Sequence, residues 1–152
     1  MTPGELLADC FNRVHEGARE VVDGLGPDQL AERPTPTSNS IAWLVWHLTR
    51  IQDDHVAEVA GREQVWTAQG FAGRFHLPVG DREVGYGMSS DQVAAIVAPA
   101  ELLTAYHQAV HDHTVEFLEG LDAADYDRVV DEHWDPPVTL LARLVSIEQD
   151  AV

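Results

Sequence analysis

Eight histidines in 152 residues are the strongest chemical signal in this sequence. Imidazole is the commonest metal ligand in proteins and the usual proton shuttle near neutral pH. His47 stands out because helical spacing places it at the edge of an apolar face, where a bundle helix meets its neighbour. Asp54 follows about two turns later on the same stripe. We therefore expect the Asp54 carboxylate to orient the His47 ring as an outer hydrogen-bond acceptor.

Four other histidines lie on the second and third predicted helices. His107 and His111 have the i, i+4 spacing of a metal-binding pair, although His107 falls on a flank and His111 on the expected solvent side. His55 and His113 fall within the apolar stripes of their helices, where a hydrogen-bonded core histidine is the more common outcome than a ligand. The pair at His107 and His111 stays open as an alternative metal site.

The remaining candidates carry weaker signals. His15 and His76 have no evident partner and are expected to be solvated, and His133 lies in an acidic loop. Cys10, the one cysteine, falls on an apolar helical face and is expected to be a core thiol and not a nucleophile. The sequence has no paired-cysteine zinc motif, no phosphate-binding glycine loop and no nucleophile elbow.

The elements that must position these residues are helices. Capping signals and 3.6-residue periodicity predict four long amphipathic helices and no strand, which is typical of an all-α bundle. The predicted helices run from the Thr2 cap to Leu25, from Ser40 to about Ala60, from Pro99 to about Gly120, and from the Thr139 cap onward. The expected inner face of the second consists of Ile41, Leu44, Val45, Leu48, Gln52, His55 and Val59.

A long connection separates the second helix from the third. Residues 62–90 contain several glycines and scattered aromatics without a sustained period, which predicts a crossover loop with at most one short helix. A loop of this length in a compact domain usually covers a site or an interface. We expect Trp66, Tyr86 and Arg82 to line the entrance to such a site.

Length, charge and cysteine content narrow the class of protein. The length predicts a single domain over residues 1–152. A net charge of −17 argues against nucleic acid and anionic membranes as partners, because both require a basic face. A single cysteine, no apolar run of transmembrane length and an acidic N-terminus without a signal-peptide pattern favour the cytoplasm.

Several segments resemble a known family. Residues 39–48 (NSIAWLVWHL) resemble the second-helix motif of the DinB-like superfamily. Within it, the similar proteins are an actinobacterial subgroup related to mycothiol-dependent maleylpyruvate isomerase. The other segments that carry this resemblance are residues 85–87 (GYG), 106–110 (YHQAV), 131–139 (DEHWDPPVT) and 143–146 (RLVS). The basic residues are all arginine, which agrees with an actinobacterial source.

The resemblance implies a DinB-like four-helix bundle in up-down-down-up order, with a long crossover between the second and third helices. It also implies a divalent metal, often Zn2+ or Ni2+, whose first ligand would be His47. The family's other two ligands lie four residues apart on the last helix. The first aligns with Asp150, and the second, a histidine of a His-x-Gly-Gln stretch, would follow Val152.

On this basis we expect the sequence to be truncated, with the last helix cut short and the third ligand missing. The next residues would then continue that helix and bring a histidine to the fourth position after Asp150. Glu148 is a substitute carboxylate, although it lies on the other side of the apolar stripe of that helix.

Two functions from different classes remain open. The first is a metal-dependent thiol S-transferase or isomerase that joins a small electrophile to a low-molecular-weight thiol such as mycothiol. The second is a non-catalytic bundle that binds a ligand or forms a homodimer, without a complete metal site. Metal content distinguishes them, because only the first requires a stoichiometric ion.

Overall fold

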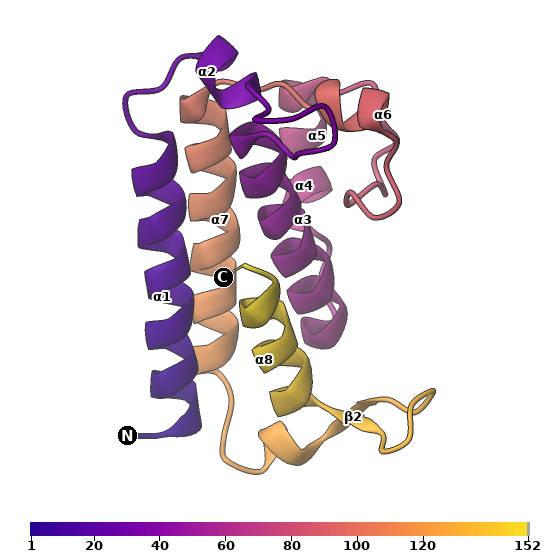
Figure 1. Ribbon diagram of the computed structural model, residues 1–152. Helices are drawn as coiled ribbons and strands as arrows, with labels where there is room; N and C mark the ends of the chain where they lie inside the picture. Colours follow the sequence, from indigo (N-terminus) through magenta and orange to yellow (C-terminus); the bar gives the residue numbers. More distant parts are fainter. Residues whose placement is uncertain (152) are drawn as a thin grey trace.

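The computed structural model describes residues 1–151, and four long helices form its frame. These are α1 (Pro3–Val22), α3 (Ile41–Ala60), α7 (Ala100–Glu119) and α8 (Leu140–Asp150). Helix α1 packs against α7, and α3 packs against both α7 and α8. Figure 1 shows α1 and α8 running up and α3 and α7 running down, which confirms the expected all-α bundle and its order.

Capping residues set the helix boundaries much as predicted. Thr2 and Glu5 form a reciprocal capping box at the start of α1. The hydroxyl of Ser40 accepts from the Trp43 amide at the start of α3, and Thr139 does the same for Ala142 at the start of α8. Gly61 ends α3 in the left-handed conformation at φ 65°.

Short elements connect the long helices. They are α2 (Pro27–Ala31), α4 (Val65–Ala68), α5 (Phe71–Phe75), α6 (Ser90–Ala94), the 3₁₀ helix η1 (Asp125–Asp127), β1 (Val129–Asp131) and β2 (Val138–Thr139). The prediction of no strand was wrong, because β1 and β2 pair in an antiparallel hairpin before α8. These strands have three and two residues, too few for an alternating pattern to be visible in the sequence.

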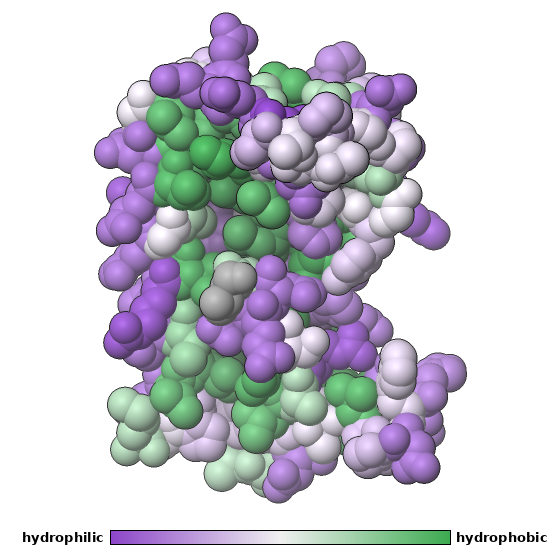
Figure 2. All heavy atoms as spheres, viewed as in Figure 1, coloured by the Kyte–Doolittle hydropathy of each residue, from purple (hydrophilic) through white to green (hydrophobic). Residues whose placement is uncertain are grey.

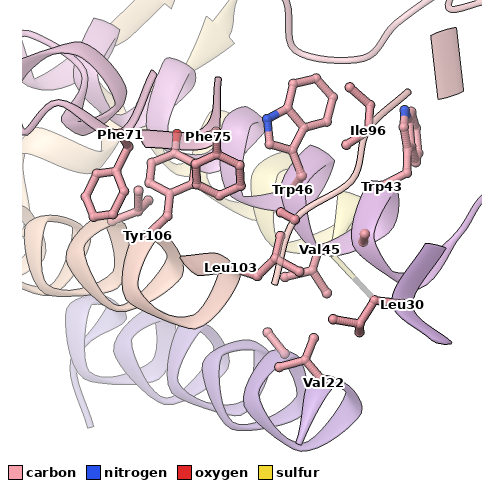
Figure 3. Close-up of a cluster of buried hydrophobic side chains, with 14 of the residues drawn as sticks. Val22, Leu30, Trp43, Val45, Trp46, Phe71, Phe75, Ile96, Leu103 and Tyr106 are labelled. Carbon is pink, nitrogen blue, oxygen red and sulfur yellow. The ribbon is translucent and has the colours of Figure 1, made fainter. Parts of the chain in front are cut away.

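The crossover between α3 and α7 is packed into the core. It contains the three short helices α4, α5 and α6, and three of its aromatic residues are buried: Trp66, Phe71 and Phe75. Their rings surround Tyr106 of α7 at centroid distances of 5.0 to 5.7 Å, and Figure 3 shows Phe71, Phe75 and Tyr106 together. The expectation that Trp66 lines an entrance was therefore wrong, since only 3% of it is exposed.

Asp53 joins this crossover to α3. Its carboxylate accepts hydrogen bonds from the amides of Val65 and Trp66, both at 2.8 Å, and from the Tyr106 hydroxyl at 2.7 Å. Asp53 thereby satisfies free amides at the start of α4, where Gln64 supplies no side-chain cap. The buried carboxylate fixes where the crossover begins.

Helix α3 buries a wider face than the one predicted, which includes the buried Val45 and Gln52. Trp43, Trp46 and Arg50 are buried under the crossover, whereas Leu44 is 47% exposed. Helical periodicity gave the predicted face and does not show that the crossover also covers α3. The crossover covers the opposite side, so α3 is buried over a wide arc. Among residues 1–151, no helix has the length and apolar character needed to cross a membrane.

Candidate metal centre

The His47 ring lies between α3 and the crossover. It stacks on Trp43, one turn earlier in α3, with ring centroids 4.5 Å apart and planes 16° apart. Tyr86 of the crossover meets it edge-on at 5.2 Å. The ring is half-buried and is held on two sides by aromatic groups.

The partner of His47 Nδ1 is a backbone carbonyl. The Val84 oxygen lies 2.5 Å from Nδ1, and because a carbonyl can only accept, Nδ1 carries the proton. Nε2 is then left with a free lone pair, the form in which imidazole binds a metal. The predicted partner was wrong: Asp54 accepts instead from Gln64 Nε2 at 2.7 Å.

Gly85 allows this close approach. Its φ is 111°, and a Cβ there would lie 2.7 Å from His47 Nδ1 and 3.0 Å from Trp43 Cζ2. A Cβ at these distances would force the His47 and Trp43 rings to shift, and the backbone conformation itself favours glycine. A backbone partner has no side-chain signature in the sequence, so only the glycine at this position marks it.

Arg50 anchors the segment that carries Val84. It is fully buried, and its guanidinium donates to the carbonyls of Asp81 at 3.2 Å and Glu83 at 3.1 Å. The same group donates to Gln64 Oε1 at 2.7 Å. Sequence reasoning did not identify Arg50, although an arginine inside an apolar helical stretch is a signal for a buried polar network.

Asp150 reaches the same place from α8. The Tyr86 hydroxyl donates to its Oδ2 at 3.1 Å. Burial, followed by the charges of Asp150 and Asp54, raises the pKa of Tyr86, so this hydroxyl keeps its proton and remains a donor. The structure thus connects Asp150 to the aromatic group that contacts His47.

His47 and Asp150 line one open groove of about 530 Å³, together with Glu148. The rest of the lining comes mostly from α1 and α3 and is largely apolar, and its residues are Arg13, Val14, Gly17, Ala18, Val21, Ile41, Leu44, Val45, Leu48 and Ala151. Figure 2 shows the hydrophobic surface between α1 and α3 in green, above the end of α8. Within residues 1–151, no three His, Cys, Asp or Glu side chains are already arranged around a metal-sized point.

Three histidines were placed wrongly by the sequence. His15 was expected in solvent, His107 on a flank and His111 on the solvent side, yet their exposed fractions are 6%, 1% and 6%. The reason is that α1 packs against this side of α7, so the buried stripe of α7 is wider than its apolar residues indicate. His113, expected inside the stripe, is half-buried.

His55 belongs to a polar network at the other end of α3. Arg143 of α8 donates to His55 Nδ1 at 3.0 Å and to Asp131 Oδ2 at 3.3 Å. His133 contacts the other oxygen of Asp131 at 2.8 Å. This network connects α3, α8 and the hairpin and does not line the groove beside His47. Arg82 of the crossover is exposed and does not line that groove either.

Comparisons with known proteins agree with this architecture. A crystal structure of a conserved protein from Enterococcus faecalis matches with a TM-score of 0.93 and 28% sequence identity, over 100% of this chain and 90% of that one. The comparison with curated proteins gave no match. The sequence profile of the DinB superfamily matches residues 11–148. With most of its length matched by this profile, the chain belongs to the DinB superfamily.

Proposed function

We propose that this protein is a divalent-metal-dependent thiol S-transferase or isomerase, which joins a small electrophile to a low-molecular-weight thiol such as mycothiol. Membership of a superfamily whose proteins often bind metal supports this proposal. The observation that carries it is the hydrogen bond from His47 Nδ1 to the Val84 carbonyl. That bond leaves Nε2 unprotonated in the groove that Asp150 also lines.

The residues of the groove have distinct roles in this proposal. His47 and Asp150 would hold Zn2+ or Ni2+, with positions left open for the sulfur of the thiol. The bound metal would lower the pKa of a coordinated thiol, so that the thiolate is present near neutral pH. Val84 orients the His47 ring and Tyr86 orients the Asp150 carboxylate. The apolar wall would bind the carbon skeleton of the electrophile. The proposal with mycothiol requires that the protein come from the cytoplasm of an actinobacterium, where this thiol is present.

Metal content tests the first half of the proposal. Purified wild-type protein should carry a divalent metal by elemental analysis, and His47→Ala should lose the ion held at His47, about one per chain, while keeping its far-UV circular dichroism. His133→Ala is the matched control, because this histidine lies in an exposed loop. Unchanged metal content in His47→Ala would move the site elsewhere.

Thiol binding tests the second half. Addition of mycothiol to the Co2+-loaded protein should produce a sulfur-to-cobalt charge-transfer band in the near ultraviolet, and the band should be absent in His47→Ala. A protein that retains Co2+ but shows no band with any low-molecular-weight thiol would favour the non-catalytic, ligand-binding bundle.

A further inference from the structure

A second group of imidazoles lies between α1 and α7, on helices that supply neither His47 nor Asp150. It consists of His15 from α1 and of His107 and His111 from α7, and we call it the histidine cluster. The His15 ring stacks on His107 with a centroid distance of 5.1 Å and on His111 with 4.5 Å. All three residues are more than nine-tenths buried. The proposed thiol chemistry uses none of them.

A chain of hydrogen bonds determines the protonation of His15. Gln108 Nε2 donates to the Asp112 carboxylate at 2.8 Å, which turns Gln108 Oε1 toward His15 Nε2 at 3.0 Å. An amide oxygen can only accept, so the His15 proton is on Nε2. The Nδ1 of His15 therefore carries a lone pair, and it accepts a hydrogen bond from Nδ1 of His107 at 2.9 Å.

This arrangement has the form of an outer shell around a metal ligand. A metal-binding histidine usually donates its other ring N–H to a carbonyl or carboxylate, which fixes the tautomer. Gln108, held by Asp112, does this for His15. In addition, Nδ1 of His111 and Nε2 of His107 are buried and have no hydrogen-bond partner among residues 1–151. A buried ring nitrogen without a partner requires an explanation.

Burial keeps the three imidazoles of the histidine cluster neutral, and the acidic residues beside them attract a cation. Burial is the largest cause that lowers the pKa of each of the three histidines, for His107 to about 3, so all three are in the metal-binding form at neutral pH. An acidic groove of about 510 Å³ borders His111 and offers an entry path. Its polar lining residues are Asp9, Asn12, Asp112, Glu116 and Glu119.

We propose that the histidine cluster is a second metal site, which binds Zn2+ or an ion of similar preference through Nδ1 of His15, His107 and His111. The rings do not yet converge, because His111 stacks parallel to His15 at an interplanar angle of 5°. Binding requires the His111 ring to turn beside the acidic groove. It also requires the His15–His107 nitrogen distance to widen to roughly 3.3 Å, the value for tetrahedral zinc with bonds of about 2.0–2.1 Å.

Cobalt titration tests this site in the absence of the other one. In a His47→Ala background we expect one Co2+ per chain, seen by its visible absorption. His15→Gln or His107→Gln added to this background should weaken binding at least tenfold, whereas His113→Gln on the same helix should not. Gln108→Ala should weaken it by about 10–100-fold, the usual effect of losing an outer partner. No binding by His47→Ala, or equal binding by the His107→Gln and His113→Gln variants, would overturn the proposal.

A measurement on unmutated imidazoles does not depend on whether the variants fold. Two-bond 1H–15N spectra of the wild-type protein report the tautomer of each histidine. Without metal, His107 should carry its proton on Nδ1, and with Zn2+ His15 and His107 should both carry it on Nε2. A His107 tautomer that does not respond to Zn2+ excludes this site, whether or not His47 binds metal.

Discussion

His47 and His107 are both helical histidines, but their ring nitrogens have different partners. His47 donates to a backbone carbonyl on the crossover and remains half-exposed beside an open groove. His107 meets another imidazole and is 1% exposed. A carbonyl can only accept and so fixes the tautomer of His47, whereas an imidazole can donate or accept, so the tautomer of His107 depends on Gln108 and Asp112. In each histidine, the hydrogen-bond partner of one ring nitrogen sets the tautomer and so decides whether the other nitrogen can bind a metal.

The two regions also differ in what supports them. The His47 region depends on one buried cation, Arg50, which holds the segment that contains Val84. The histidine cluster depends on the packing of two long helices, α1 and α7. A change to Arg50 should therefore disturb the first region more than the second, and acid should disturb the second more than the first.

The largest expected effect is that of Arg50→Met. Removal of the guanidinium leaves Asp53 buried without its cation, 3.8 Å away, and frees two carbonyls of the crossover. Loss of one partner of a buried pair costs about 3–5 kcal/mol in the free energy of unfolding. Urea denaturation measures this, and metal binding at His47 should fall as well.

Arg13→Ala is the control for Arg50→Met. Arg13 pairs with Asp9 at 2.8 Å, but both side chains are more than half exposed, so no measurable loss of stability is expected. If Arg50→Met costs no more than Arg13→Ala, the crossover is held by its aromatic packing and not by Arg50.

Acid should affect the histidine cluster next most strongly. The folded pKa of His107 is about 3, below its unfolded value of 6.5, so the folded state binds fewer protons than the unfolded one. The contribution of His107 to the free energy of unfolding is then fully present above pH 6.5. It decreases as the pH falls below that value, by about 1.4 kcal/mol per pH unit for one such group. Urea denaturation in EDTA between pH 7 and pH 4.5 should show this slope.

His107→Gln should reduce that slope, because glutamine does not titrate. His133→Gln should leave it unchanged, since His133 lies in the exposed loop. A slope that is the same in His107→Gln and in wild type would assign the acid sensitivity to carboxylates elsewhere.

The sequence predicted the long helices well because their signals are local. Thr2, Ser40 and Thr139 each cap a helix through contacts within three residues, and Gly61 ends one through its own backbone. The site was predicted less completely because its geometry depends on distant contacts. Val84 reaches His47 across 37 positions in the sequence, through a backbone atom that no residue type reveals.

The histidine cluster could not be predicted for a related reason. Helical periodicity identifies the apolar stripe of a helix, but it does not show how wide a neighbouring helix makes the buried face. His107 and His111 extend the buried stripe of α7 with polar residues, which a hydrophobicity pattern reads as solvent-exposed. Leu44 gives the converse case, an apolar residue on α3 that remains 47% exposed.

Gly85→Ala should have a smaller but more local effect. The new Cβ would meet His47 Nδ1 at 2.7 Å in a backbone conformation that alanine disfavours, which costs about 1–3 kcal/mol. Gly87→Ala separates the two causes, because its φ of 71° is also unfavourable but nothing lies within 4 Å of its Cβ. It should cost about 1 kcal/mol and spare metal binding at His47. Equal loss of metal in both variants would show that loop conformation matters and the close approach to His47 does not.

The smallest expected effect is that of Tyr86→Phe, which tests how much a single hydroxyl contributes to the region around His47. The variant removes the hydrogen bond to Asp150 at 3.1 Å but keeps the ring against His47. Tyr86 is 62% exposed, so water can replace the hydroxyl and the free energy of unfolding should not change measurably. Metal affinity should fall by about tenfold, the lower limit for loss of an outer partner. Zinc titration measures it, with Tyr126→Phe in η1 as the control. An unchanged affinity in Tyr86→Phe would mean that Asp150 needs no orienting partner, and the ordering of the groove would then rest on His47 and Val84 alone.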